Sequence, residues 1–216
     1  MMLSTAAPMQ AQMTVDPVIL AFDRPDLKRQ DMLVGNVGLR PLYLEVSAAR
    51  ILEPAAVGET YLTSPNPDEV GLLVAPRRIV LQPGEEKTVR VIRLDQDFKT
   101  DQAWRVQFKP VIGDVITDTP VAIPLIAVKA LVFARPGGAT AKIIGQREGR
   151  ALLLANVGNT NAVISNGVQC AAPGIDCQAV SGKRLWPGMV WSTRLPLDAP
   201  VSFQVKDAGP DRSIEF

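Results

Sequence analysis

Short apolar runs broken by turn residues follow one another along the sequence from Met13 to the end. Residues 41–47 and 104–111 alternate apolar and polar side chains, the period of a half-buried β-strand, and helical periodicity is scarce. Strands spaced by about eight to twelve residues are typical of a β-sandwich. The sequence therefore predicts an all-β fold, with enough chain among its 216 residues for one large or two smaller domains.

The longest apolar run covers residues 119–136 and carries a single cation, Lys129. Its β-branched composition predicts a long strand, although an apolar run alone does not exclude a buried helix. The apolar side chains that define its faces are those of Val121, Ile123, Leu125, Ile126 and Val128. The first three share one face, whereas from Ile126 onwards both faces are apolar. Burial on both sides requires two partners, the strand's own domain and a second surface, unless the strand lies in the centre of a sandwich.

A Pro-Gly-Gly segment at residues 136–138 ends this run and is the best candidate for a domain boundary. Two short motifs occur on both sides of it in the same order, Asn-Val-Gly at 36–38 and 156–158, and Leu-x-Pro-Gly at 81–84 and 185–188. We interpret them as a weak similarity between two sandwiches, with coincidence as the alternative. The predicted domains are residues 12–136 and 137–216.

Residues 1–11 resemble the end of a secretory signal peptide, with small residues before a cut after Ala11. The positively charged start and full apolar core of such a signal are missing, so we expect a truncated signal and a mature chain that begins near Gln12. No stretch reaches the length of uninterrupted apolar residues that a membrane span needs, and we expect no membrane insertion.

Charge and composition argue against several functional classes. The net charge of +1 provides no overall electrostatic footprint for nucleic acid. Histidine is absent, which removes the commonest general base, the commonest metal ligand and any Ser-His or Cys-His pair. The adjacent Glu85 and Glu86 stand beside Lys87 in a turn and fit surface charge better than acid–base catalysis. We therefore predict no catalytic residues, no metal site and no cofactor.

Cys170 and Cys177 are the only cysteines. Their spacing is too wide for a redox Cys-x-x-Cys motif, and the sequence offers too few partners for zinc. A disulfide that closes a small turn is the simplest interpretation in an exported protein, and two reduced, buried cysteines are the alternative.

Residues 73–91, residues 104–111 and the end of the long strand at residues 133–136 together resemble the PapD-like periplasmic chaperones of the chaperone–usher pathway. Within this family, the Trp-Arg-Val-x-Phe-x-Pro strand at residues 104–110 and the two cysteines ahead of Leu-Trp-Pro-Gly are most similar to the branch that assembles class 5 (alternate, or α) fimbriae. The resemblance implies two immunoglobulin-like sandwiches arranged in an L. It also implies a non-enzymatic periplasmic protein that binds, folds and caps fimbrial subunits and delivers them to an outer-membrane usher.

The mechanism implied is donor-strand complementation, in which the chaperone lends its long strand to a subunit that lacks one. In the best-known branch, an Arg of the first strand and a Lys of the long strand hold the subunit's C-terminal carboxylate. Residues 15–22 contain no Arg, so we predict that Arg105, on a neighbouring strand, acts with Lys129. A solvated strand face is the alternative for Arg105. Pro124 interrupts the strand and leaves its register open.

Arg135 matches an Arg at the family's domain hinge, which implies an interdomain salt bridge with an acid such as Asp198. Two other functional classes are compatible with a β-sandwich. A cell-surface immunoglobulin-like adhesin or structural module is permitted equally by composition, whereas a hydrolase is disfavoured because histidine is missing.

Overall fold

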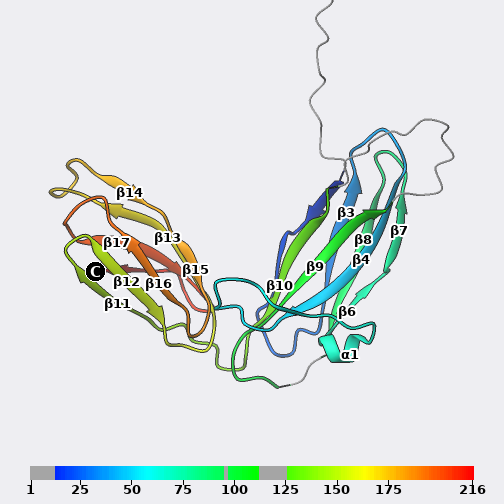
Figure 1. Ribbon diagram of the computed structural model, residues 1–216, viewed down its shortest axis with the longest axis horizontal. Helices are drawn as coiled ribbons and strands as arrows, with labels where there is room; N and C mark the ends of the chain where they lie inside the picture. The colour runs from blue at the N-terminus through cyan, green and yellow to red at the C-terminus, as the bar shows by residue number, and fades with distance from the viewer. Residues whose placement is uncertain (1–12, 95–96, 112–125) are drawn as a thin grey trace, which may run out of the picture.

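The structure is a computed structural model that describes residues 13–94, 97–111 and 126–216 (Figure 1). Strands dominate these ranges, and the single helix among them is too short to span a membrane. The elements of the first half are β1 (Met13–Asp16), β2 (Ile19–Phe22), β3 (Arg29–Asn36), β4 (Leu42–Ile51), β5 (Tyr61–Leu62), α1 (Pro67–Val70), β6 (Leu72–Ala75), β7 (Arg78–Leu81), β8 (Glu86–Arg93), β9 (Gln102–Val111) and β10 (Val128–Ala134). Those of the second half are β11 (Ile143–Glu148), β12 (Ala151–Asn156), β13 (Ala162–Gln169), β14 (Gln178–Val180), β15 (Lys183–Leu185), β16 (Val190–Arg194), β17 (Val201–Lys206) and β18 (Arg212–Glu215). This confirms the predicted all-β fold.

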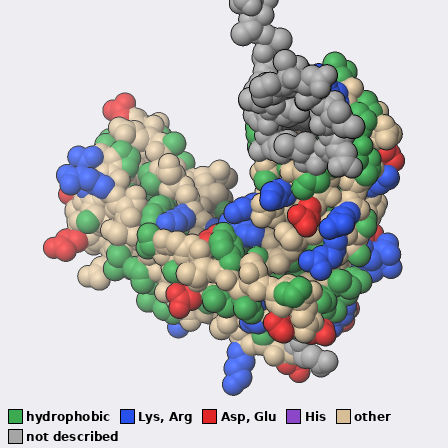
Figure 2. Space-filling model, turned by 45° about the vertical axis from the view of Figure 1, so that its right-hand side comes forward, with side chains coloured by type: hydrophobic (Ala, Val, Ile, Leu, Met, Phe, Trp, Pro, Cys, Tyr) green, Lys and Arg blue, Asp and Glu red, His purple; other side chains and the backbone are tan. Residues whose placement is uncertain are grey.

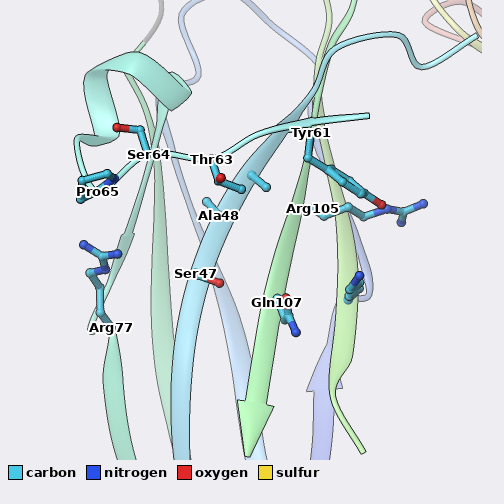
Figure 3. Close-up of a pocket in the computed structure, with 11 residues that line it drawn as sticks. Ser47, Ala48, Tyr61, Thr63, Ser64, Pro65, Arg77, Arg105 and Gln107 are labelled. Atoms are coloured by element: carbon cyan, nitrogen blue, oxygen red, sulfur yellow. The ribbon is translucent and has the colours of Figure 1, made fainter. Parts of the chain in front are cut away.

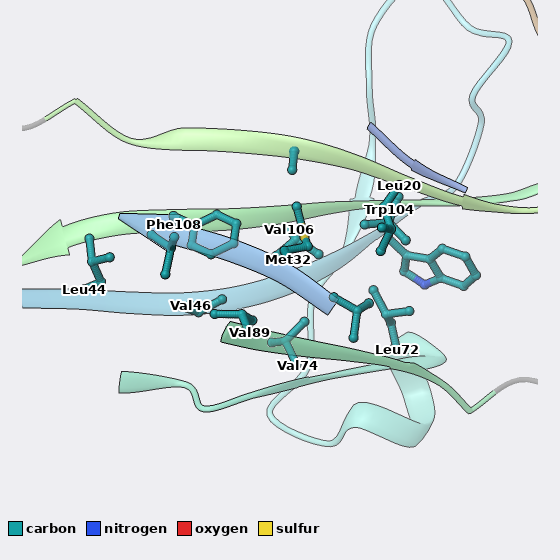
Figure 4. Packing of buried hydrophobic residues seen from close by; sticks show 14 of the residues in the cluster. Leu20, Met32, Leu44, Val46, Leu72, Val74, Val89, Trp104, Val106 and Phe108 are labelled. Atoms are coloured by element: carbon teal, nitrogen blue, oxygen red, sulfur yellow. The ribbon is translucent and has the colours of Figure 1, made fainter. Parts of the chain in front are cut away.

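Two sheets face each other in the first domain. One has the strand order β1-β3-β8-β6, and the other has the order β2-β10-β9-β4-β5, with β7 also paired to β4. The alternation expected of residues 104–111 is realised in β9, because Trp104, Val106 and Phe108 are fully buried in the core between the sheets (Figure 4). The indole of Trp104 donates a hydrogen bond of 2.7 Å to the carbonyl of Val70 at the end of α1.

Prolines divide two segments that the sequence pattern presents as continuous strands. Residues 15–22, in which we sought the Arg of a single first strand, belong to two strands instead. β1 ends before Pro17 and pairs with β3, whereas β2 begins after it and pairs with β10 in the opposite sheet. Pro76 likewise separates β6, which pairs with β8, from β7, which pairs with β4. Proline has no N–H for the ladder, so the chain changes sheets at these points.

The second domain is a smaller sandwich. Its sheets have the orders β11-β12-β16 and β14-β13-β17-β18, with β15 also paired to β13. Leu152, Leu154, Ile164, Leu185 and Phe203 form the centre of its core. A disulfide joins Cys170 to Cys177 beyond the end of β13, as the sequence predicts.

The repeated motifs form the same corner in both domains. Asn36 and Asn156 are buried, and the amide nitrogen of each donates to two backbone carbonyls, at 2.8 and 3.0 Å for Asn36 and at 2.8 and 2.9 Å for Asn156. One of these carbonyls belongs to Leu81 or Leu185, the first residue of the Leu-x-Pro-Gly motif. The glycine of that motif donates its backbone N–H back to the asparagine carbonyl at 2.8 Å in both domains. The motifs are therefore equivalent parts of two similar sandwiches, and coincidence is excluded.

The two domains meet at one end of each and enclose an angle (Figure 1). Within the described residues, strands pair only inside their own domain, and the boundary that we propose at residues 136–138 lies between β10 and β11. An apolar cluster of Ile51, Ala103, Phe133 and Trp186 crosses the junction, with the Phe133 and Trp186 rings edge to face at 5.9 Å. The sheet formed by β2, β10, β9, β4, β5 and β7 is called the six-stranded sheet below, and its outer face is the one turned away from the core of the first domain. The contact with Trp186 covers one end of this outer face.

Candidate functional site

A cavity of about 450 Å³ lies on the outer face of the six-stranded sheet (Figure 3). Strands β4, β9 and β10 form its floor, and the segment that contains β5 forms one side. Its polar lining includes Ser47, Tyr61, Arg77, Arg105, Gln107 and Lys129. Lys and Arg side chains gather on this part of the surface, beside the hollow between the domains, with an acidic side chain among them (Figure 2).

Strand register explains why the cavity adjoins the domain junction. Ile51, Ala103 and Phe133 are aligned across β4, β9 and β10, and this row is the one covered by Trp186. The next row on the same face contains Arg105, and the row after it contains Gln107 opposite Lys129. Arg105 and Lys129 are thus diagonal neighbours on adjacent strands, one and two rows from the junction. The structure brings the two predicted cations to one cavity.

Arg105 is not a solvated cation on an open strand face. Its guanidinium donates two hydrogen bonds to the carboxylate of Glu59, from Nε to Oε2 at 3.0 Å and from Nη2 to Oε1 at 2.5 Å. The Tyr61 hydroxyl donates to the same carboxylate. These hydrogen bonds, the one from Arg105 above all, lower the pKa of Glu59, and the Glu59 carboxylate raises the pKa of Arg105.

Lys129 also has a partner within the chain. Its ammonium lies 5.7 Å from the centre of the Tyr61 ring, within the range of a cation–π interaction. Lys129 is also exposed, so solvent is the outlet that a cation in an otherwise apolar strand requires, and the Tyr61 ring is an additional partner.

Sequence reasoning missed Arg77, which lines the cavity, and Glu59, which binds Arg105. Arg77 is exposed and directly follows Pro76, at which the chain crosses to the six-stranded sheet. This proline is the sequence signal that could have identified Arg77. Glu59 belongs to a loop without periodicity, so nothing in the sequence associates it with Arg105.

The backbone of β10 is paired unequally along its length. Residues 131–134 pair with both β9 and β2, whereas Val128, Lys129 and Ala130 pair with β9 alone among the described residues. The N–H groups of Leu131 and Arg135 donate to β2 and its flanks, at 2.9 and 3.0 Å. Because the direction of the peptide groups alternates, the N–H and C=O of Lys129 face the same side as those of Leu131, at a position that precedes the start of the parallel strand β2.

The predicted donor-strand residues divide into two groups. Val121, Ile123 and Leu125 lie outside the described residues. Ile126 is 60% exposed just before β10, and Val128 is half-buried against the core of its own domain. The apolar pattern on both faces near the end of β10 has an explanation within the chain, because Trp186 covers the outer face at Phe133.

Arg135 lies buried at the domain junction. It forms an ion pair of 2.9 Å with Asp23 of its own domain and donates to Thr160 Oγ1 at 2.6 Å and to the carbonyl of Asn161 at 3.1 Å in the second domain. The expectation of an ion pair with Asp198 is wrong, because Asp198 pairs with Arg147 at 3.0 Å. Asp23 follows β2, which runs parallel to β10, so it is brought beside Arg135.

A second polar contact crosses the junction nearby. The Asp101 carboxylate accepts hydrogen bonds from the backbone N–H of Asn161 at 2.6 Å and from its side-chain amide at 2.5 Å. Burial raises the pKa of Asp101 despite these hydrogen bonds.

The other candidate groups have structural roles. Glu85 pairs with Lys87 at 3.1 Å, and its pKa is lowered mainly by a hydrogen bond from the backbone N–H of Gln82. Among the described residues, no group of three or more acidic, histidine or cysteine side chains could hold a metal ion.

The sequence matches no protein-family model and no curated protein sequence. The fold, in contrast, is similar to those of fimbrial chaperones of the chaperone–usher pathway. The class 5 fimbriae chaperone CfaA is similar with a TM-score of 0.68 and 20% identity, over 94% of this chain and 97% of that one. A chain from a chaperone–tip adhesin complex of CFA/I fimbriae biogenesis has a TM-score of 0.65 and 19% identity, over 95% and 98%. A chain from the Salmonella enterica complex of the SafA pilin with the SafB chaperone has a TM-score of 0.66 and 14% identity, over 97% and 98%.

Proposed function

We propose that this protein is a non-enzymatic periplasmic chaperone that binds, folds and caps fimbrial subunits by donor-strand complementation and delivers them to an outer-membrane usher. The fold is the first support, since the similar structures include chaperones and their complexes with a pilin or a tip adhesin. The disulfide supports an oxidising compartment such as the periplasm, where such bonds persist.

One observation carries the proposal: the edge of β10 at residues 128–130, which pairs with no described residue, lies directly beside the cationic cavity. Lys129 contributes to both, with its backbone at the edge and its ammonium in the cavity. An extended segment of a subunit could add to this edge by main-chain hydrogen bonds, and its terminal carboxylate could reach Arg105 and Lys129. A carboxylate removed from water needs charge-assisted partners of this kind.

The remainder of the lent strand would be the apolar residues from Val121 to Ile126. A subunit that lacks a strand exposes an apolar groove, and aliphatic side chains of the chaperone would fill it. Each aliphatic side chain that becomes buried contributes about 1.5–3 kcal/mol before the cost of ordering is subtracted. The exposed Ile126 is the described residue best placed for this role.

Co-expression in the periplasm with candidate fimbrial subunits, followed by co-purification, tests the proposal. We expect one-to-one capture by the wild type that is lost or greatly weakened in Arg105→Ala and Lys129→Ala. Lys109→Ala is the matched control, because Lys109 is exposed on the same face of β9 but does not line the cavity. Capture that survives both cavity changes would reject the anchor, and failure to capture any subunit would count against the function.

A further inference from the structure

The cations of the cavity are already engaged by one segment of the chain itself. Glu59 belongs to the excursion between β4 and β5, and Tyr61 is the first residue of β5 that follows it. A hydrogen bond of 3.0 Å from the Leu52 N–H to the Thr60 carbonyl closes the excursion at its base. From this excursion the Glu59 carboxylate binds Arg105, and the Tyr61 ring lies against Lys129. Both cations proposed to hold a ligand therefore have internal partners.

The two cations lie on strands that are not neighbours of β5. β5 pairs with β4 at the edge of the sheet, whereas Arg105 lies on β9 and Lys129 on β10, which are the second and third strands in from β5. The side chain of Tyr61 therefore extends inward over the sheet towards Arg105 (Figure 3). The small side chain of Ala49, which is aligned with Arg105 on β4, leaves room for this crossing.

The chemistry of Glu59 is that of the proposed ligand. Its carboxylate accepts two N–H groups from one guanidinium, which is the favoured geometry for any carboxylate on arginine. Arg105 also lowers the pKa of Glu59, which favours the ionised carboxylate. A subunit's C-terminal carboxylate could not form the same two hydrogen bonds while Glu59 holds them.

Building on the proposed function, we infer that Glu59 occupies the carboxylate site of the free protein as an internal substitute and must leave Arg105 when a peptide C-terminus binds. Because Glu59 must first be displaced from Arg105, every carboxylate ligand binds more weakly, by the free energy of the Glu59–Arg105 pair. An isolated small carboxylate then competes poorly, whereas a ligand that also adds a strand to β10 gains enough to displace Glu59. Glu59 thus selects for chain termini that are attached to a complementary strand.

The test uses the full-length protein and two synthetic probes. One is an acetylated octapeptide of alternating threonine and valine with a free C-terminal carboxylate, and the other is the same peptide ending in an amide. Binding is followed by NMR titration of the wild type and of the Glu59→Gln, Arg105→Gln and Glu53→Gln variants. Glu53 is exposed in the same excursion, so Glu53→Gln controls for the loss of one negative charge. Thermal unfolding verifies that each variant is folded.

We expect Glu59→Gln to bind the acid peptide about three- to five-fold more tightly than the wild type, the equilibrium equivalent of an exposed ion pair. Binding of the amide peptide should be the same in both proteins, and Glu53→Gln should behave as the wild type. In the wild type, the Arg105 Nε–H signal, assigned by its absence from Arg105→Gln, should shift as the acid peptide replaces Glu59.

Two results would overturn the inference. If Glu59→Gln binds the acid peptide no better than the wild type, while Arg105→Gln loses the preference for acid over amide, Glu59 merely orients Arg105, and the proposed anchor stands. If neither the wild type nor Glu59→Gln distinguishes acid from amide, the cavity is not a carboxylate site, and the anchor is lost together with the inference. Subunit capture in the periplasm then decides separately whether the protein is a chaperone.

Discussion

Replacement of the two corner asparagines by alanine should destabilise the two domains by similar amounts. In Asn156→Ala, the carbonyls of Thr160 and Leu185 each lose a donor, and the backbone N–H of Gly158 loses its acceptor at 3.0 Å. The backbone N–H of Lys142 also loses a longer contact with the same side chain, at 3.3 Å. At about 1 kcal/mol for each of the three shorter hydrogen bonds, the free energy of unfolding of the second domain should fall by at least about 3 kcal/mol. Its melting temperature should fall by about 12–24 °C.

Asn36→Ala removes the three equivalent hydrogen bonds from the first domain. The carbonyls of Arg40 and Leu81 each lose a donor, and the backbone N–H of Gly38 loses its acceptor. The free energies of unfolding of the two domains should therefore fall by similar amounts. The shift in melting temperature should be smaller in the first domain, because a larger domain has a larger unfolding entropy.

Hydrogen exchange resolved by domain, combined with guanidinium unfolding, measures both effects in one protein. Val37→Ala and Val157→Ala are matched controls in the same two loops, because both side chains are about half exposed, and each should change stability by less than about 0.5 kcal/mol. Losses below about 1 kcal/mol in both asparagine variants would refute the reasoning, since water would then be replacing the lost hydrogen bonds. A loss in only one domain would refute the equivalence of the two corners.

Three further predictions concern the junction and the second domain. Arg135→Ala should widen the distribution of interdomain angles in small-angle X-ray scattering, because it removes two hydrogen bonds to the second domain, and an unchanged profile would contradict this. Burial raises the pKa of Asp101 in the folded state above its value in the unfolded chain. Between these two pKa values the folded state binds more protons than the unfolded state. The contribution of Asp101 to the free energy of unfolding should therefore fall as the pH rises through the pKa of the folded state. Urea unfolding at several pH values should show that fall in the wild type but not in Asp101→Asn. Replacement of Cys170 and Cys177 by serine should lower the free energy of unfolding of the second domain by about 2.5 kcal/mol in the chain-entropy model, as measured by guanidinium unfolding under oxidising conditions.

Sequence reasoning succeeded where a local period decides the outcome. The alternation of β9 predicted Trp104, Val106 and Phe108 on one face and Arg105 on the other, because successive side chains of any strand point to opposite sides. The two short asparagine motifs predicted two similar domains, since each motif makes the same local turn and the same return hydrogen bonds.

Contacts between distant segments were decided only by the tertiary structure. The pattern of β10 showed that both its faces are apolar, but it could not show that Trp186 covers one of them. Similarly, the sequence indicated that Arg135 needs an acid, and only the parallel pairing of β2 with β10 brings Asp23 rather than Asp198 to it.

The candidate site depends on both kinds of information. The sequence by itself determined that Arg105 points away from the buried face of β9, whereas it left the facing of β10, and so of Lys129, open. Only the tertiary structure decided that Arg105 and Lys129 lie in one cavity and that Arg105 is hydrogen-bonded to the Glu59 carboxylate. The physical reason is that a strand's period is set by its own backbone, whereas the position of an aperiodic loop is set by long-range packing and charge.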